Sequence, residues 1–119
     1  MNVLIVDDEP DLCDCLVMLL ESKGHHASQA NSGIEGLQAL DKESYDLIIS
    51  DIRMPDCDGI EFLEQIKLKM DPIPPFIYMS AFSELTKEDA ISQGAIDLVR
   101  KPILFSEMIK IIENHNTQS

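Results

Sequence analysis

The sequence has few basic residues and no long hydrophobic runs, and each shortage argues against a class of protein. Nine lysines and arginines stand against 22 aspartates and glutamates, which gives a formal net charge of -13 at pH 7. So few cations disfavour binding to a nucleic-acid backbone or to an anionic membrane surface. No apolar stretch approaches the roughly 20 residues that span a bilayer, and the N-terminal segment lacks the pattern of a signal peptide. We therefore expect a cytoplasmic protein with no nucleic-acid or membrane partner.

Aromatic residues and cysteines are also scarce. Aromatic residues make up 5% of the chain and tryptophan is absent, so Leu, Ile, Val and Met must fill most of a core. Cys13, Cys15 and Cys57 are odd in number and have neither a disulfide framework nor zinc-ligand spacing. With 119 residues and a hydrophobic fraction of 45%, the chain fits a single domain over residues 1–119.

Short apolar runs alternate with helical patterns along the chain. The runs predict buried strands at Val3–Val6, Asp46–Ser50, Phe76–Met79 and Ile96–Val99, and a polar edge strand at His25–Ala30. Apolar residues at helical spacing predict five helices. The first runs from Pro10 to just before Gly24, and its apolar face carries Leu12, Cys15, Leu16, Leu19 and Leu20. The second begins at a capping box of Ser32 and Glu35 and ends at about Lys42. The third lies around Phe62, Leu63, Ile66 and Met70, the fourth runs from about Leu85 to Gln93, and the fifth lies around Phe105, Met108, Ile109 and Ile112.

This alternation predicts an α/β fold. Strand–helix repeats without hairpin signals imply parallel strands joined by right-handed crossovers. Nearly continuous apolar strands fit a sheet that is covered on both faces. We therefore expect a five-stranded, doubly wound, flavodoxin-like parallel sheet of order 2-1-3-4-5 with five helices.

The polar residues that interrupt the apolar runs collect at the carboxyl ends of the expected strands. Asp7 and Asp8 follow the first strand, Asp51 the third, Ser80 the fourth and Lys101 the fifth. In an open parallel sheet, these ends border one crevice where ligands bind. The first and third strands are neighbours in the expected order, so the three aspartates should converge there.

Three converging carboxylates repel one another unless a cation joins them. A hard divalent ion with oxygen ligands meets that need, and Mg²⁺ is the natural candidate. The alternative, that each acid merely caps a helix, suits one aspartate but not the five polar residues together. The sequence therefore predicts a magnesium site that involves Asp7, Asp8 and Asp51.

In this arrangement the chain resembles the bacterial response-regulator receiver domains, the CheY-like family. The resemblance covers essentially the whole chain, and the order and spacing of its motifs together are specific. These motifs are Asp7-Asp8, Asp51, Met54-Pro55, Asp58-Gly59, Ser80-Ala81, Gly94-Ala95 and Lys101-Pro102.

The resemblance implies a signalling function in a two-component system. It implies that Asp51 accepts a phosphoryl group from a histidine kinase or a histidine phosphotransferase, and that Asp7, Asp8, Asp51 and the backbone carbonyl of Arg53 bind Mg²⁺. It also implies that Lys101, before a cis proline, and Ser80 contact the phosphoryl oxygens. Phosphorylation would then switch the face formed by the fourth helix, fifth strand and fifth helix toward a protein target. Such a protein catalyses its own phosphorylation and dephosphorylation and is not an enzyme with a separate substrate.

Two positions depart from the common pattern of the family. Leu98 stands three residues before the lysine, where many members carry Tyr or Phe, and we expect it to be a buried strand residue. Arg53 lies near the entry to the site, where it can obstruct water or pair with an acid such as Asp56. The sequence does not identify a downstream target.

Three other functions fit parts of the pattern. A pseudo-receiver would signal without phosphate, but the set of acids, hydroxyl and lysine is complete. A metal-dependent phosphatase with an aspartate nucleophile usually has a second aspartate two residues later, where this chain has Arg53. A nucleotide- or flavin-binding domain needs a glycine-rich loop after the first strand, and Asp7 and Asp8 stand there instead.

Overall fold

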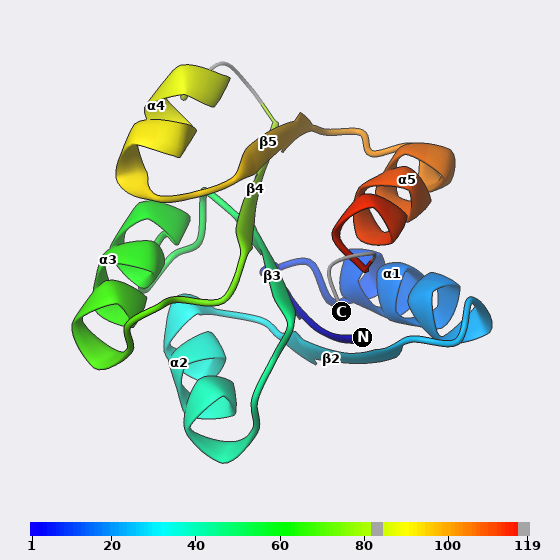
Figure 1. Cartoon of the computed structure of the whole chain (residues 1–119), viewed down its shortest axis with the longest axis horizontal. Coiled ribbons are helices and arrows are strands. Elements are labelled where there is room, and N and C mark those ends of the chain that lie inside the picture. The colour runs from blue at the N-terminus through cyan, green and yellow to red at the C-terminus, as the bar shows by residue number, and fades with distance from the viewer. Residues whose placement is uncertain (82–84, 117–119) are drawn as a thin grey trace.

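The computed structural model describes residues 1–81 and 85–116, and it has the expected architecture (Figure 1). The strands are β1 (Asn2–Val6), β2 (His26–Ala30), β3 (Leu47–Asp51), β4 (Phe76–Ser80) and β5 (Asp97–Arg100). The helices are α1 (Pro10–Ser22), α2 (Gly33–Lys42), α3 (Gly59–Lys69), α4 (Lys87–Gln93) and α5 (Phe105–Asn116). All strand pairs are parallel, and the sheet order is β2-β1-β3-β4-β5, so the predicted topology is confirmed.

The sheet has helices on both faces, and each face has its own apolar cluster. Helices α1 and α5 cover one face, whereas α2, α3 and α4 cover the other (Figure 1). Side chains that alternate along a strand point to opposite faces. In β1, Leu4 and Val6 therefore join the cluster under α2, α3 and α4, and Val3 and Ile5 join the cluster under α1 and α5. This burial fixes the register of the strands and so the positions of their carboxyl ends.

Helix α1 differs slightly from its expected orientation. Cys13, Leu16 and Leu20 are fully buried, whereas Cys15, which we placed on the apolar face, is exposed. Leu12 and Leu19 are half-buried at the margin of the interface. The actual stripe follows the i, i+3, i+7 spacing from Cys13, which brings this cysteine beneath the carboxyl end of β1.

The starts of two helices also show how local hydrogen bonds set the boundaries. Helix α4 begins at Lys87 and not at Leu85, because Thr86 and Asp89 form a reciprocal capping box. At α2, Ser32 accepts a bond from the Glu35 amide as expected, but the Glu35 carboxylate accepts from the amide of Asn31. None of the helices in the described part of the chain is long and apolar enough to cross a membrane.

Candidate functional site

The three predicted acids meet at the carboxyl ends of β1 and β3. Val6 and Ser50 are partners in the parallel register, so Asp7 and Asp51 follow at the same level on adjacent strands. One carboxylate oxygen from each of Asp7, Asp8 and Asp51 lies within 4.8 Å of the others. The predicted convergence is therefore confirmed. Asp7 and Asp51 are buried, whereas Asp8 is exposed.

The surrounding backbone fixes Asp7. Its amide donates to the Ala30 carbonyl at 3.1 Å, which continues the β1–β2 pairing by one residue. Its carbonyl accepts bonds from the side-chain amide of Asn31 at 3.1 Å and from the thiol of Cys13 at 3.4 Å. The Glu9 amide donates to its Oδ1 at 2.9 Å. Three bonds hold the backbone of Asp7 and one holds its fully buried carboxylate, so the residue has little freedom to move.

Asp51 is the last residue of β3, and the following loop packs closely over it. The Ile52 amide donates to its Oδ1 at 2.9 Å. Gly59, the first residue of α3, lies so close that an added Cβ would clash with the Asp51 carbonyl oxygen. Its amide also donates to the Ile52 carbonyl at 2.7 Å. The Asp58-Gly59 pair of the sequence pattern therefore closes the loop onto the strand end, with Asp58 as the N-cap of α3.

Lys101 supplies the cation of the site. Its Nζ lies 2.8 Å from Oδ2 of Asp7, 3.4 Å from Oδ2 of Asp51 and 3.3 Å from Oε1 of Glu9. Its amide donates to the Ser80 carbonyl at 2.7 Å, which ties the end of β5 to the end of β4. The Lys101–Pro102 peptide bond is cis, as expected, and so is the Asp71–Pro72 bond, which the sequence did not suggest.

The electrostatics of the site are dominated by two buried acids, Asp7 and Asp51, and by the lysine beside them. Burial raises the pKa of Asp51 to about 6, helped by the charge of Asp7, although Lys101 acts in the opposite direction. Burial likewise raises the pKa of Asp7, and Lys101 offsets part of this rise. Burial by itself would lower the pKa of Lys101, but its bonds to Asp7 and the charge of Asp51 raise it. The lysine therefore stays charged, and the two buried acids ionise less readily than usual.

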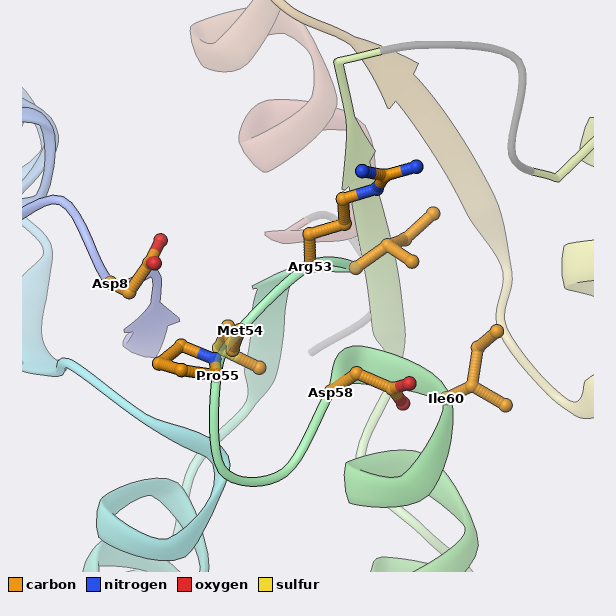
Figure 2. A pocket seen from close by; sticks show the side chains of 7 residues that line it. Asp8, Arg53, Met54, Pro55, Asp58 and Ile60 are labelled. Carbon is orange, nitrogen blue, oxygen red and sulfur yellow. The ribbon is translucent and has the colours of Figure 1, made fainter.

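A cavity of about 560 Å³ lies between Asp8 and the loop after β3 (Figure 2). Its lining is formed by Asp8, Ile52, Arg53, Met54, Pro55, Asp58 and Ile60. The Arg53 side chain is exposed and leads away from Asp8, so it leaves this side of the acidic cluster open (Figure 2). Of the three clustered acids, Asp8 lines the cavity, so an incoming group can reach the exposed edge of the cluster through it.

The remaining candidates are also at their expected strand ends. Ser80 is fully buried at the end of β4, one residue beyond Met79, which pairs with Asp51 in the register. Leu98 is buried in the apolar cluster under α4, as expected for a strand residue. Its neighbour in the register, Tyr78, is fully buried and donates its hydroxyl to Oε1 of Gln93 on α4 at 2.8 Å.

Sequence reasoning missed two residues that contact the acidic cluster. Glu9 contacts Lys101, and Asn31 contacts Asp7. For Glu9 the available signal was a third acid directly after Asp7 and Asp8. For Asn31 it was a polar side chain at the carboxyl end of β2, which is the neighbour of β1 in the predicted sheet order.

Comparison with known proteins identifies the family. The family model for the response regulator receiver domain matches residues 3–113 of the chain. The chain belongs to this family. Phosphoryl acceptance is the function of receiver domains, and histidine kinases phosphorylate them. Receiver domains generally bind Mg²⁺ at an acidic pocket, and this receiver has an acidic cluster of Asp7, Asp8 and Asp51.

Relatives of this receiver domain include longer regulators. It is 34% identical to the transcriptional regulatory protein ZraR of Escherichia coli K12 over 95% of the chain and 26% of the relative. It is 38% identical to the two-component response regulator ORR22 of Oryza sativa subsp. indica over 93% of the chain and 16% of the relative. The chain thus spans about a quarter or less of the length of these curated relatives.

Solved receiver structures match nearly the whole fold. The Francisella response regulator 1452 receiver domain has a TM-score of 0.89 at 26% identity and covers 98% of this chain and 97% of its own. The receiver domain of NtrX from Brucella abortus has a TM-score of 0.86 at 28% identity, with 98% and 99% covered. These likenesses agree with the sheet order and helix placement described above.

Proposed function

We propose that Asp51 accepts a phosphoryl group from the phosphohistidine of a histidine kinase or a histidine phosphotransferase. One observation supports this assignment above all. The Asp51 carboxylate lies at the end of a central strand, with two other carboxylates within 4.8 Å and the Lys101 ammonium at 3.4 Å. Within the described residues, no other cluster of three acids, cysteines or histidines has the geometry to hold a metal ion.

The donor set fits Mg²⁺. The cluster of Asp7, Asp8 and Asp51 holds three carboxylates, and Lys101 contacts two of them, so the cluster keeps an excess of negative charge that a divalent cation balances. Their oxygens are the ligands that Mg²⁺ prefers. We propose that Asp7, Asp8, Asp51 and the Arg53 carbonyl hold the ion. When bound, Mg²⁺ neutralises charge on the phosphoryl oxygens and on the acids that face them.

The side chains of the site divide the transfer reaction between them. An ionised Asp51 oxygen forms a bond to phosphorus as the bond between phosphorus and the donor imidazole nitrogen breaks, and the imidazole leaves with the bonding electrons and takes up a proton. The pKa of Asp51, about 6, leaves most of its carboxylate ionised at neutral pH. Lys101 moves from the carboxylates to a phosphoryl oxygen, and the Ser80 hydroxyl donates to another.

The acyl phosphate of Asp51 stores the signal until water hydrolyses it. In this proposal the receiver domain, which we assign to residues 1–119, turns over its own phosphoryl group and no separate substrate. Movement of Ser80 toward the phosphoryl group would shift the position of α4, β5 and α5 and present this face to a protein target. Leu98 cannot supply the hydroxyl that an aromatic switch residue often carries. The hydrogen bond from Tyr78 to Gln93 joins β4 to α4, and the shift of α4 would strain it.

Intact mass measurement tests the proposal directly. The protein is incubated with Mg²⁺ and acetyl phosphate, and we expect one added phosphoryl group. The group should be absent from Asp51→Asn and present in Asp56→Asn, which changes an exposed aspartate in the adjacent loop. An unchanged mass of the parent protein would refute the assignment and favour a phosphate-independent module. Steady hydrolysis of an added phosphoester would favour a phosphatase.

A further inference from the structure

Glu9 is a third carboxylate partner of Lys101, and it approaches the lysine from a different side. Asp7 and Asp51 contact the ammonium from the interior, with side chains 0% and 9% exposed. The Glu9 side chain is 65% exposed, and its Oε1 lies 3.3 Å from the same Nζ. The Glu9 amide donates to Asp7, so its backbone is fixed while its side chain reaches back to the lysine.

The surroundings of this ion pair place it at an opening of the site. A cavity of about 430 Å³ is lined by Glu9, Leu12, Ala81, Lys101, Pro102 and Ile103. Glu9 and Lys101 both border this cavity, so their contact lies at its edge. Breaking their contact requires only an exposed side chain to turn into solvent, and the buried acids keep their other bonds.

We propose that Glu9 is a positioning residue that competes with the phosphoryl group for Lys101. The inference depends on the proposed function, because it assumes that Lys101 moves to a phosphoryl oxygen on Asp51. In the unphosphorylated state Glu9 helps to keep the ammonium beside the carboxylates. A phosphoryl group on Asp51 carries more negative charge than one carboxylate, so it displaces Glu9 from Lys101. Glu9 therefore lowers the affinity of the site for phosphoryl-like anions and slows phosphorylation.

The competition can be measured with beryllofluoride, a stable mimic of a phosphoryl group, by calorimetric titration in the presence of Mg²⁺. Glu9→Gln should bind it roughly two- to fivefold more tightly, the range expected for loss of one exposed ion pair. Asp11→Asn is the matched control, because it removes one exposed charge two residues further along, at a residue that forms no ion pair with Lys101 in the described structure. It should change the affinity by less than about 1.5-fold.

Two further variants separate a specific contact from the general effect of charge. Glu9→Asp keeps the charge but shortens the side chain, so it should bind more tightly, like Glu9→Gln. In a Lys101→Met background, Glu9→Gln should give no more gain than Asp11→Asn. The same affinity in Glu9→Gln as in the parent, or an equal gain with and without Lys101, would overturn the inference. A parent that does not bind beryllofluoride, or an Asp51→Asn variant that still does, would overturn the proposed function as well.

Discussion

The interior of the central strands and their carboxyl ends are buried to a similar extent, but burial has opposite consequences in the two regions. Val3 to Val6 of β1 are fully buried and alternate between the two apolar clusters. Asp7, the next residue, is equally buried, and Asp51 at the end of β3 is 6% exposed. Burial of apolar groups stabilises the fold, whereas burial of a carboxylate costs free energy unless a cation compensates it. The strand interiors therefore determine the fold. At the strand ends, the buried carboxylates destabilise the protein, and a bound cation can offset this cost.

The largest expected effect comes from breaking the apolar region. Phe62→Ala removes a fully buried ring that packs against Phe76 with ring centroids 5.8 Å apart. The cavity and the lost apolar burial should lower the free energy of unfolding by about 3–5 kcal/mol, measured by urea denaturation. Leu68→Ala on the same helix is the control, because Leu68 is 79% exposed, and it should cost less than about 0.5 kcal/mol. Similar losses in both variants would contradict the described packing of α3.

Breaking the polar region should have the next largest effect. Lys101→Met removes the ammonium within 3.4 Å of two buried carboxylates. In the presence of a chelator we expect a loss of about 2–3 kcal/mol, below the usual cost of breaking a fully buried pair, because the Lys101 side chain is 14% exposed. Lys87→Met is the matched control. It removes an exposed ion pair with Asp97 and should cost less than about 1 kcal/mol. Equal losses would mean that Lys101 acts as an ordinary surface lysine.

The same contrast explains how much of the fold could be predicted. The apolar runs of β1, β3 and β4 and the helix patterns between them are local signals, and they gave the parallel sheet and its order. Finer details depended on contacts that the pattern does not encode. The burial of Cys13 in place of Cys15 was decided by packing of α1. The start of α4, in contrast, follows a local signal, the capping box of Thr86 and Asp89, which the expected start at Leu85 overlooked.

The site was predictable to the extent that sheet topology brings strand ends together. Asp7, Asp8, Asp51, Ser80 and Lys101 could be selected because each follows a recognisable strand. The partners of these residues could not, since side-chain direction decides them. Glu9 precedes α1 and looks like a residue of an exposed first turn, and Asn31 follows a weak edge strand. Their contacts with Lys101 and Asp7 emerge only when the chain is folded.

Replacing Asp51 by asparagine should raise the free energy of unfolding, whereas most substitutions lower it. Its pKa in the folded protein is about 6, above the ordinary value of 3.8, so between these pH values the folded state binds more protons than the unfolded state. Stability therefore falls as pH rises through this window, in a site where Asp7, Asp8, Glu9 and Lys101 face the group. With a chelator present, Asp51→Asn should be more stable than the parent by about 2 kcal/mol at pH 8.

The gain should disappear when the pH is lowered. Below about pH 3 the parent carboxyl is largely protonated in both states, so thermal unfolding midpoints of the parent and of Asp51→Asn should converge. Asp11→Asn, an exposed acid of α1, should show a difference that hardly varies with pH. A gain for Asp51→Asn that persists in full at about pH 3 would show that the asparagine improves packing and that ionisation is not the cause.

The smallest expected effect comes from adding Mg²⁺, whose positive charge would compensate the carboxylates at the strand ends. Mg²⁺ at ten times its dissociation constant should stabilise the parent by about 1.4 kcal/mol, since it binds the folded site. Asp8 allows a clean test, because it is exposed and its loss should change the stability in chelator by less than about 0.5 kcal/mol. Asp8→Asn should nevertheless lose most of the Mg²⁺-dependent rise in unfolding temperature, whereas Asp14→Asn, another exposed acid, should keep it.

If Mg²⁺ stabilised the parent and Asp8→Asn equally, the exposed acid would have no part in metal binding. The buried pair of Asp7 and Asp51 would then have to hold the ion in direct competition with Lys101, and Lys101→Met should in that case bind Mg²⁺ more tightly than the parent.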